Sequence, residues 1–377
     1  MIYLDNAATS WPKPTCVIEA MENCLVNFCA NPGRSGHDMA LKSGRLVYDC
    51  RCLVADMFGL ENPENVIFTQ NATQALNIII KGILNPASHT IITSMEHNSV
   101  FRPIASSGAI YDVVEADKYG YVNSEDVEKF IRPNTSLIIC TLSSNVCGSV
   151  QPFEEIALVA KKHNIPFLLD ASQGAGNIIV NMTKSKIDFL AAPGHKGLLG
   201  PTGTGVLCIN STLRLKSFID GGTGSDSKLI IQPEYLPDRF ESGTLNVVGI
   251  AGLKAGIEYI NMLGIDYISE REKLLEQKLV ANLSLIRGIT LKGYDNSRKR
   301  CPVISFVIDG KDSMMMANRL NAEYNIALRS GFHCAYTAHK SIGTDAVGTI
   351  RVSPGIFNST KDIDALSVAL KEIALQI

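Results

Sequence analysis

One lysine lies within a run of glycines in the segment FLAAPGHKGLLGPTGTG, residues 189–205. The glycines of this segment permit tight turns and a close approach of the backbone. A lysine amine in such a confined, poorly hydrated place loses its proton readily and can form a Schiff base. Lys196 is therefore the first candidate for a catalytic residue.

The glycine run could instead be a nucleotide-binding loop. However, GHKGLLGPTGTG does not match G-x-x-x-x-G-K-[ST], and neither it nor GGTGSD forms a G-x-G-x-x-G that opens a helix. An apolar stretch typical of a strand, GVLCI, follows the glycines. These features argue against both nucleotide motifs.

Polar residues end several other apolar runs. Asp170 closes IPFLLD, where a carboxylate needs a partner, and it could cap the next segment or hold a cationic ring nitrogen. Asn145 and the pair Glu96 and His97 also follow apolar runs. A single histidine is more often structural than catalytic. Ligands of open α/β sheets bind at the carboxyl ends of strands, so three such polar ends indicate a shared site.

The segment TQNAT, residues 69–73, follows an apolar run and opens a helical pattern. Backbone N–H groups at such a helix start bind phosphate well, although Asn71 or Thr73 could serve as a helix cap alone. A lysine for an aldehyde, an acid for a pyridinium and a helix N-terminus for a phosphate together describe pyridoxal 5'-phosphate (PLP).

The elements that must position these residues are short apolar runs alternating with helical patterns. Continuous apolar runs are typical of strands that are buried on both faces. The predicted strands are 66–69, 90–94, 111–116, 136–142, 165–170, 188–192 and 205–209. Helical patterns such as 72–83 and 153–164 lie between them. This alternation predicts an α/β fold with a mostly parallel sheet and helices on both sides.

The pattern changes after about residue 262. A long amphipathic helix over 266–286 is followed by further strands and helices: strands near 302–308, 326–329 and 348–353, and helices near 313–324 and 360–376. This indicates a smaller α+β domain. We therefore expect a large domain over residues 15–262 and a small domain formed by residues 1–14 together with 263–377.

Composition excludes several classes of protein. The 377 residues carry a formal net charge of -2. This charge does not indicate binding to nucleic acid or to an anionic membrane. No apolar run approaches the length of a transmembrane helix, and MIYLDNAATSWPKP is not a signal peptide. The ten cysteines include no C-x-x-C pair, so we expect no metal site and a cytoplasmic, reducing compartment.

A series of segments along the chain resembles a known family. They are YLDNAATSWPKP, NPGRSGHDMA, TQNATQALN, MEHNSV, SSNVCGSVQP, LLDASQGAG, APGHKGLLGPTGTG, RFESGTLN, LRSGFHCA and IRVSPGIFN. In this order they resemble the class V aminotransferase-like, fold-type I PLP enzymes, and within them the cysteine desulfurases and selenocysteine lyases of the SUF-type, short-loop group. The resemblance implies a large PLP-binding α/β domain, a smaller α+β domain and a homodimer.

The resemblance also implies a reaction. A cysteine desulfurase removes sulfur from L-cysteine to give L-alanine and a persulfide, whereas a selenocysteine lyase gives alanine and selenide from L-selenocysteine. A thiol or an acceptor protein would then take the sulfur or selenium. Other PLP activities on this scaffold, such as an aminotransferase, a kynureninase-like hydrolase or an epimerase, do not need a loop cysteine. A non-catalytic scaffold would not need an intact Lys196.

The resemblance assigns cofactor contacts to particular residues. Lys196 would carry the Schiff base, Asp170 would pair with the pyridine nitrogen, and Gln173 would lie near the ring hydroxyl. His97 would stack on the ring and assist proton transfer. The remaining cofactor-binding residues are Ala72, Thr73, His195 and Thr244, of which Thr73 and His195 hold the phosphate and Thr244 arrives from the other subunit.

The resemblance makes Cys334 the nucleophile that takes sulfur from the substrate. A sulfur nucleophile must be a thiolate on an accessible loop, and Arg329 and His333 are close enough in sequence to help lower the pKa of Cys334. Substrate binding would fall to four residues: Arg351 and Asn145 on the substrate carboxylate, with Arg329 and His37 as further pocket residues. A guanidinium binds a carboxylate through two parallel hydrogen bonds, although Arg351 could instead be a surface charge.

One position departs from the family pattern. A serine or threonine that touches the phosphate is common where this chain has Pro193, which has no hydroxyl. One phosphate contact must therefore be lost or replaced, by Thr69 or by water.

Overall fold

The structure, a computed structural model, describes residues 1–33, 36–226 and 228–375. Its larger sheet has seven strands in the order β2-β8-β7-β6-β5-β3-β4. The strands are β2 (Val66–Thr69), β3 (His89–Thr93), β4 (Ile110–Val114), β5 (Thr135–Thr141), β6 (Phe167–Asp170), β7 (Phe189–Pro193) and β8 (Gly205–Ile209). All seven strands predicted in this part of the chain are confirmed, with bounds that agree to within two residues.

The direction of the strands follows from the connections between them. Strands β3 to β7 pair in parallel, whereas β8 is antiparallel to both β2 and β7. The parallel strands need a crossover connection, but the chain from β7 to β8 turns back directly through the glycine run. Because β8 alone is reversed, β2 runs in the same direction as β7.

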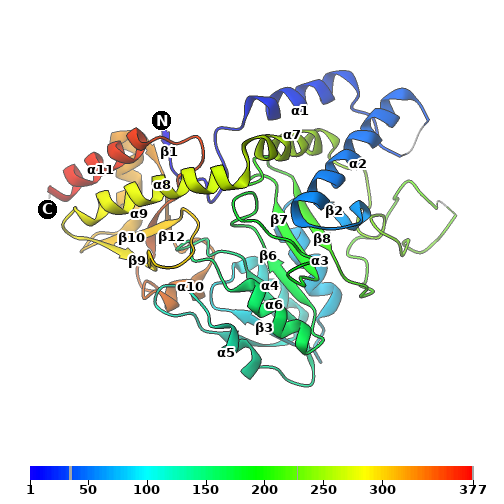
Figure 1. The fold of residues 1–377 in the computed structure, drawn as a ribbon, viewed down its shortest axis with the longest axis horizontal. Helices are drawn as coiled ribbons and strands as arrows, with labels where there is room; N and C mark the ends of the chain where they lie inside the picture. The colour runs from blue at the N-terminus through cyan, green and yellow to red at the C-terminus, as the bar shows by residue number, and fades with distance from the viewer. Residues whose placement is uncertain (34–35, 227, 376–377) are drawn as a thin grey trace.

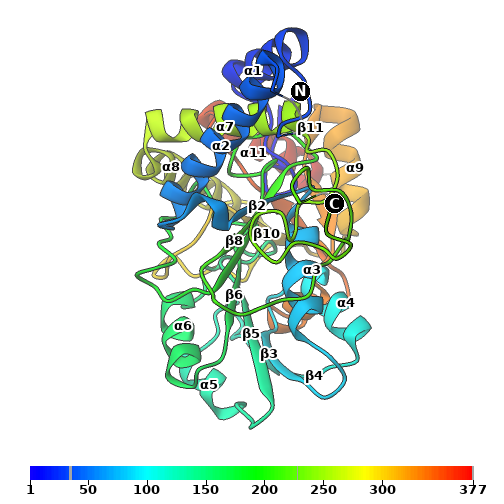
Figure 2. The same ribbon diagram turned by 90° about the vertical axis from the view of Figure 1, so that its right-hand side faces the viewer.

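Helices cover both faces of this sheet. Alternate strand residues face opposite sides, so Ile67 packs in one core and Val66 in the other. Helices α3 (Ala72–Ile83) and α4 (Asn98–Ser107) cover the first face, and α6 (Phe153–Lys162) lies on the opposite one (Figure 2). The second face also receives α2 (Asp38–Phe58), α5 (Ser124–Lys129) and α7 (Val247–Leu263). This double cover explains why the strands are continuous apolar runs.

A second, antiparallel sheet has four strands in the order β12-β13-β10-β9. These are β9 (Ile289–Lys292), β10 (Ile304–Ile308), β12 (Arg329–Gly331) and β13 (Thr349–Val352). Helices α8 (Ile265–Ser284), α9 (Ser313–Tyr324) and α11 (Thr360–Leu375) lie around it, and both chain ends are at this side of the molecule (Figure 1). Sequence patterns missed β9 and the short helix α10 (Tyr336–Ser341).

The N-terminal segment joins this second unit. Strand β1 (Ile2–Tyr3) pairs in parallel with β11 (Ile326–Ala327), and Leu4 is fully buried in the core that contains residues of α8, α9 and α11. Helix α1 (Thr15–Asn27) then packs against α7. A division at residues 14 and 262 stays a prediction. No described helix combines the length and the apolar character that a membrane span requires.

Candidate active site

The candidate residues gather at one edge of the larger sheet. His97 follows β3, Asn145 follows β5, Asp170 ends β6 and Lys196 follows β7. These strands are parallel, so their carboxyl ends meet at the same edge. The start of α3 at Ala72 follows β2 at that edge as well. The segments thus lie at one edge of the sheet, and their use as a shared site stays a prediction.

Lys196 has the electrostatic setting of a nucleophilic amine. Burial lowers the pKa of Lys196 to about 8, while Asp170 opposes this shift and Arg351 adds to it. The side chain is nevertheless partly exposed, because it lines a cavity together with Gln173 and Ser353. The neutral form of the amine is therefore accessible close to neutral pH.

The glycines around Lys196 make room for other parts of the protein. A Cβ on Gly197 would lie 2.0 Å from the carbonyl oxygen of Ala175, and one on Gly205 would lie 2.7 Å from the carbonyl carbon of Asn71. The loop that carries Lys196 therefore packs directly against the segment after Asp170 and against the start of α3.

Asp170 and Gln173 occupy the loop after β6. The Asp170 side chain is 2% exposed, accepts a hydrogen bond from the backbone N–H of Ser172 over 2.9 Å, and forms no ion pair within the described residues. A buried carboxylate of this kind fits a cationic ligand group. Gln173 donates from Nε2 to the carbonyl oxygen of Ala7 over 2.8 Å, which fixes its side chain.

His97 begins helix α4 and is held there by its own side chain. Its Nδ1 accepts a hydrogen bond from the backbone N–H of Ser99 over 3.1 Å and lies 2.9 Å from the Ser99 hydroxyl. Burial lowers the pKa of His97, Asp170 opposes the shift, and Lys196 adds to it. The imidazole is therefore neutral, with its proton assigned to Nε2 because Nδ1 accepts from an amide.

Hydroxyl and backbone amide groups lie at the start of α3, and an imidazole lies on the loop after β7. The hydroxyl oxygens of Thr73 and Ser99 are 2.8 Å apart. The first backbone N–H groups of the helix, at Ala72 and Thr73, have no partner in the preceding turn. Burial lowers the pKa of His195 to about 4, and its buried Nδ1 has no partner among the described residues. These groups fit a phosphate.

Pro193 is the last residue of β7 and pairs with Gly205 of β8. Thr69, at the end of β2, directs its hydroxyl to the carbonyl oxygen of Asn71 over 3.0 Å. Replacement of the lost hydroxyl by Thr69 stays a prediction.

Arg351 is 1% exposed, so the alternative of a surface charge is wrong. Its Nη2 forms an ion pair with Asp5 Oδ1 at 2.5 Å, and its Nη1 donates to the backbone carbonyl of Asn145 over 3.0 Å. Its Nε has no partner among the described residues. The guanidinium is therefore fixed in direction and retains a free N–H. Sequence patterns missed Asp5, whose partner lies at the other end of the chain.

Cys334 is exposed on a loop that is tied to the site at two points. Its carbonyl oxygen accepts from the backbone N–H of Asn98 over 2.8 Å, and the carbonyl oxygen of His333 accepts from Asn145 Nδ2 over 2.7 Å. Both loop residues have positive φ, 50° for His333 and 60° for Cys334. Non-glycine residues adopt such angles in pairs only where the surroundings enforce them.

A guanidinium, and not an imidazolium, accompanies the Cys334 thiol. Arg329 Nη2 lies 3.6 Å from Cys334 Sγ. His333 is buried, and its pKa is lowered to about 2 by burial and then by Arg351. The prediction that His333 helps to acidify the thiol is therefore wrong, because its ring stays neutral and turns inward to Thr349.

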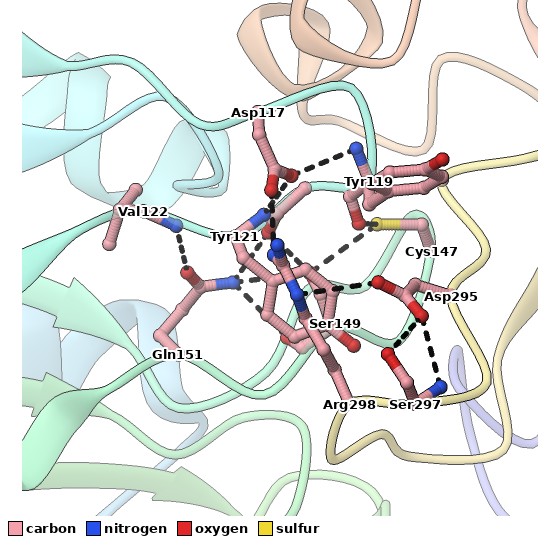
Figure 3. Close-up of polar contacts among 12 residues, drawn as sticks. Asp117, Tyr119, Tyr121, Val122, Cys147, Ser149, Gln151, Asp295, Ser297 and Arg298 are labelled. Carbon is pink, nitrogen blue, oxygen red and sulfur yellow. Dashed lines mark hydrogen bonds and ion pairs between the residues drawn. The ribbon is translucent and has the colours of Figure 1, made fainter.

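A polar cluster supports the loop that carries Asn145 (Figure 3). Gln151 accepts from the backbone N–H of Val122 over 3.1 Å and donates to the carbonyl oxygen of Gly120 over 2.8 Å. The Arg298–Asp117 ion pair, at 2.6 Å, joins the same cluster from the second unit. The Gln151 contacts thus fix the segment that follows the turn after Asn145.

Two predicted site residues make their contacts elsewhere. Thr244 is exposed and accepts from Asn31 Nδ2 over 3.3 Å. His37 is also exposed and caps α2 by accepting from the backbone N–H of Ala40. Within the described residues, neither forms a hydrogen bond with another candidate site residue.

The other cysteines behave differently from Cys334. All ten are free thiols, and burial raises the pKa of Cys50 and of Cys301 to about 12 in each case. The described residues contain no cluster of His, Cys, Asp and Glu side chains that could hold a metal ion.

The family model for aminotransferase class-V matches residues 2–366. The chain belongs to this family. Its members use PLP as their cofactor, and the unpaired Asp170 carboxylate, the Lys196 amine and the free His195 Nδ1 fit that group. The fold is accordingly that of the fold-type I PLP enzymes.

Several relatives of this aminotransferase class-V chain are named cysteine desulfurases. A "Probable cysteine desulfurase" of Methanothermobacter thermautotrophicus is 34% identical over 99% of this chain and 94% of that protein. A cysteine desulfurase of Synechococcus elongatus is 30% identical over 99% of this chain and 60% of its own length.

Solved structures of cysteine desulfurases have the same fold. The apo structure from Thermococcus onnurineus NA1 has a TM-score of 0.93 at 31% identity, covering 100% of this chain and 95% of that chain. The structure of CsdA (S-sulfonic acid) from Escherichia coli has a TM-score of 0.88 at 26% identity, covering 99% and 94%.

Proposed function

We infer that the chain is a PLP-dependent cysteine desulfurase that converts L-cysteine to L-alanine and retains the sulfur as a persulfide on Cys334. The observation that carries this proposal is the 2.8 Å hydrogen bond from Asn98 N–H to the Cys334 carbonyl. Asn98 directly follows His97, so this bond holds an exposed thiol beside the residue proposed to stack on the cofactor. An aminotransferase or a hydrolase has no need of such a thiol.

The cofactor contacts follow from the donors that the site presents. Lys196 would hold the cofactor, and the Asp170 carboxylate would face its ring nitrogen. The α3 start at Ala72 and Thr73, together with His195, would bind its phosphate. When bound, PLP supplies an electron sink for the substrate Cα.

Proton transfer falls to the Lys196 amine. Its lowered pKa, about 8, lets Nζ accept the proton of the substrate Cα and return one later to Cβ. The neutral His97 Nε2 can donate in the same region, because its Nδ1 is already engaged by Ser99.

The substrate carboxylate would bind to Arg351, whose Nε is free. Asp5 and the Asn145 carbonyl orient the guanidinium toward one position. The Asn145 amide holds His333 in this structure, so we propose that it first fixes the loop and then adjusts to the substrate.

The sulfur step needs Cys334 as a thiolate, and the Arg329 guanidinium lies 3.6 Å from its Sγ. A bond forms between Cys334 Sγ and the substrate sulfur, and the substrate Cβ–S bond breaks. The electron pair of that bond and a proton from Lys196 remain on Cβ, so that L-cysteine and the thiol give L-alanine and the persulfide. A thiol or an acceptor protein then removes the sulfur.

We also propose that the enzyme is a homodimer in which Thr244 and His37 complete the site of the second subunit. Both are exposed and form no hydrogen bond with the other candidate residues in the described part of the chain. The ten free thiols suit a reducing cytoplasm.

The test is L-alanine release by the PLP-loaded protein from L-cysteine and, separately, from L-selenocysteine. We expect the wild type to release alanine from L-cysteine and Cys334→Ala to lose that activity. Cys29→Ser, which changes another exposed thiol, is the matched control and should stay active. Alanine from L-selenocysteine alone would identify a selenocysteine lyase, and no alanine from either substrate would overturn the proposal.

A further inference from the structure

Lys13 is a half-buried cation to which the proposed reaction gives no role, and it forms no ion pair within the described residues. Its Nζ donates to the hydroxyl oxygen of Ser10 over 2.6 Å and to the carbonyl oxygen of His195 over 2.9 Å. Burial lowers the pKa of Lys13 to about 8, and no carboxylate offsets that shift. The N-terminal segment therefore brings a cation to the loop of Lys196, where its two hydrogen bonds go to neutral oxygens.

Ser10 connects Lys13 to the peptide group that follows Lys196. The hydroxyl of Ser10 has one hydrogen, and the carbonyl oxygen of Lys196 is its closer acceptor, at 2.9 Å against 3.2 Å for that of His195. The same hydroxyl oxygen accepts the hydrogen bond from Lys13. The backbone N–H of Ser10 also donates to the His195 carbonyl oxygen over 3.0 Å. Ser10 and Lys13 thus bind both peptide groups that flank the Cα of Lys196.

Other contacts hold the same stretch of backbone. The Leu199 N–H donates to the Lys196 carbonyl oxygen over 2.9 Å, so that oxygen receives two hydrogen bonds when that of Ser10 is included. Gly197, the next residue, packs against the Ala175 carbonyl oxygen so closely that a Cβ would not fit. With its main chain held on both sides, Lys196 can reorient its amine only through its side-chain torsions.

The backbone around Lys13 is stiff because Pro12 and Pro14 flank it. Each proline fixes its own φ at about −65°, and the residue before a proline is restricted to extended conformations, which applies to Lys13. Proline also reduces the conformational freedom of the unfolded chain, so less entropy is lost when the segment is ordered. The sequence therefore presents the Lys13 side chain from a segment with little freedom.

We propose that Lys13 and Ser10 are positioning residues that fix the main chain of Lys196, so that its amine meets the cofactor aldehyde in one orientation. Both act through the carbonyl groups of His195 and Lys196. The same contacts fix the backbone of His195, whose ring is proposed to bind the phosphate. The inference rests on the role proposed for Lys196.

The experiment measures PLP capture by apoprotein variants at pH 7, both as the rate at which absorbance at about 420 nm appears and as the dissociation constant. Lys13→Met removes the ammonium but keeps the length of the side chain, whereas Lys13→Arg keeps a cationic donor. We expect Lys13→Met to capture PLP about tenfold more slowly and to bind it about tenfold more weakly, as the loss of one charge-assisted hydrogen bond predicts. Lys13→Arg should recover most of both losses.

Tyr3→Phe is the matched control for a general loosening of the N-terminal segment. It removes a hydroxyl that lies 3.2 Å and 2.9 Å from the carbonyl oxygens of Asp5 and Thr9, and it leaves the contacts with the Lys196 loop in place. We expect this variant to capture PLP like the wild type. Thermal unfolding of each apoprotein, followed by the fluorescence of Trp11, the only tryptophan of the chain, reports whether it folds.

Wild-type rate and affinity in Lys13→Met would overturn the proposal, and so would an equal loss in Tyr3→Phe or a Lys13→Arg variant that is stable but captures PLP no better than Lys13→Met. If Lys13→Met does not fold, Ser10→Ala decides instead: it should capture PLP about threefold more slowly, and a wild-type rate would overturn the proposal. PLP capture does not require sulfur chemistry, so a wild type that captures PLP without releasing alanine contradicts only the proposed function.

Discussion

Asp5 and Arg351 lie 346 residues apart in the chain and form an ion pair of 2.5 Å at the candidate active site. The Arg351 side chain is 1% exposed and the Asp5 side chain is 20% exposed. The second terminal nitrogen of Arg351 donates to the Asn145 carbonyl. The N-terminal segment thus fixes the direction of a guanidinium that sits on β13 of the second unit. A change in the N-terminal segment should therefore also change substrate binding.

Replacing Asp5 should weaken both stability and substrate binding. Asp5→Ala removes a charge-assisted hydrogen bond, which costs about 2 kcal/mol of unfolding free energy, and leaves Arg351 free to turn away. We expect a higher KM for L-cysteine with unchanged PLP affinity. Asp5→Asn keeps the acceptor oxygen and should fall between the wild type and Asp5→Ala. Wild-type KM and urea midpoint in Asp5→Ala would contradict this account.

The side-chain amide of Asn145 is proposed both to hold the Cys334 loop and to contact the substrate. A single variant distinguishes these two roles. Asn145→Leu has a similar size, adds no charge beside Arg351 and removes the hydrogen bond to His333, a loss of about 1 kcal/mol. If the amide mainly holds the Cys334 loop, kcat for alanine release falls about fivefold while KM changes little. A raised KM with wild-type kcat would show instead that the amide acts only on the substrate. Steady-state kinetics with L-cysteine distinguish the two.

The lowered pKa of Lys196 predicts the pH dependence of cofactor capture. The protonated share of the amine falls as pH rises through about 8, and only the neutral amine attacks an aldehyde. The rate at which the apoprotein takes up PLP should therefore rise up to about pH 8 and level off above it. A rate that climbed steadily to pH 10 would mean that the amine has the ordinary pKa of an exposed lysine.

Acid should destabilise the fold through its buried neutral histidines. The pKa of His333 is lowered to about 2 by burial, so the unfolded chain binds a proton below about pH 6.5 that the folded chain does not. Stability is fully present above that pH and falls by about 1.4 kcal/mol per pH unit below it for this group.

His333→Gln provides the comparison for that prediction. Urea unfolding at pH 7, 6 and 5 should show a shallower decline for the variant than for the wild type. Equal slopes would mean that His333 is protonated in the folded protein.

The sequence predicted all seven strands of the larger sheet, most of which are buried, and missed the half-exposed strand β9 of the smaller sheet. Strands such as β6 and β7 are continuous apolar runs, which only a covered sheet explains. β9 is half-exposed at the edge of its sheet, so its residues show no clear pattern. Residues such as Asp170 and Lys196 could be found because each follows a strand in the same sheet.

The sequence could not predict contacts between residues far apart in the chain, nor the surroundings of individual side chains. Asp5 was visible in YLDNAAT, but nothing there indicates a partner near residue 351. His333 was expected to assist Cys334 because the two are adjacent, yet their side chains point to different surroundings: one is buried and the other is exposed. Neighbours in sequence share a site only when the backbone turns both side chains toward it.

The most direct measurement is the location of the sulfur after one turnover. The PLP-loaded wild type is mixed with one equivalent of L-cysteine, digested and examined by mass spectrometry without a reductant. The account predicts one equivalent of L-alanine and one added sulfur atom on the peptide that contains Cys334. Alanine formation with the sulfur released free, or bound to another of the cysteines, would contradict it.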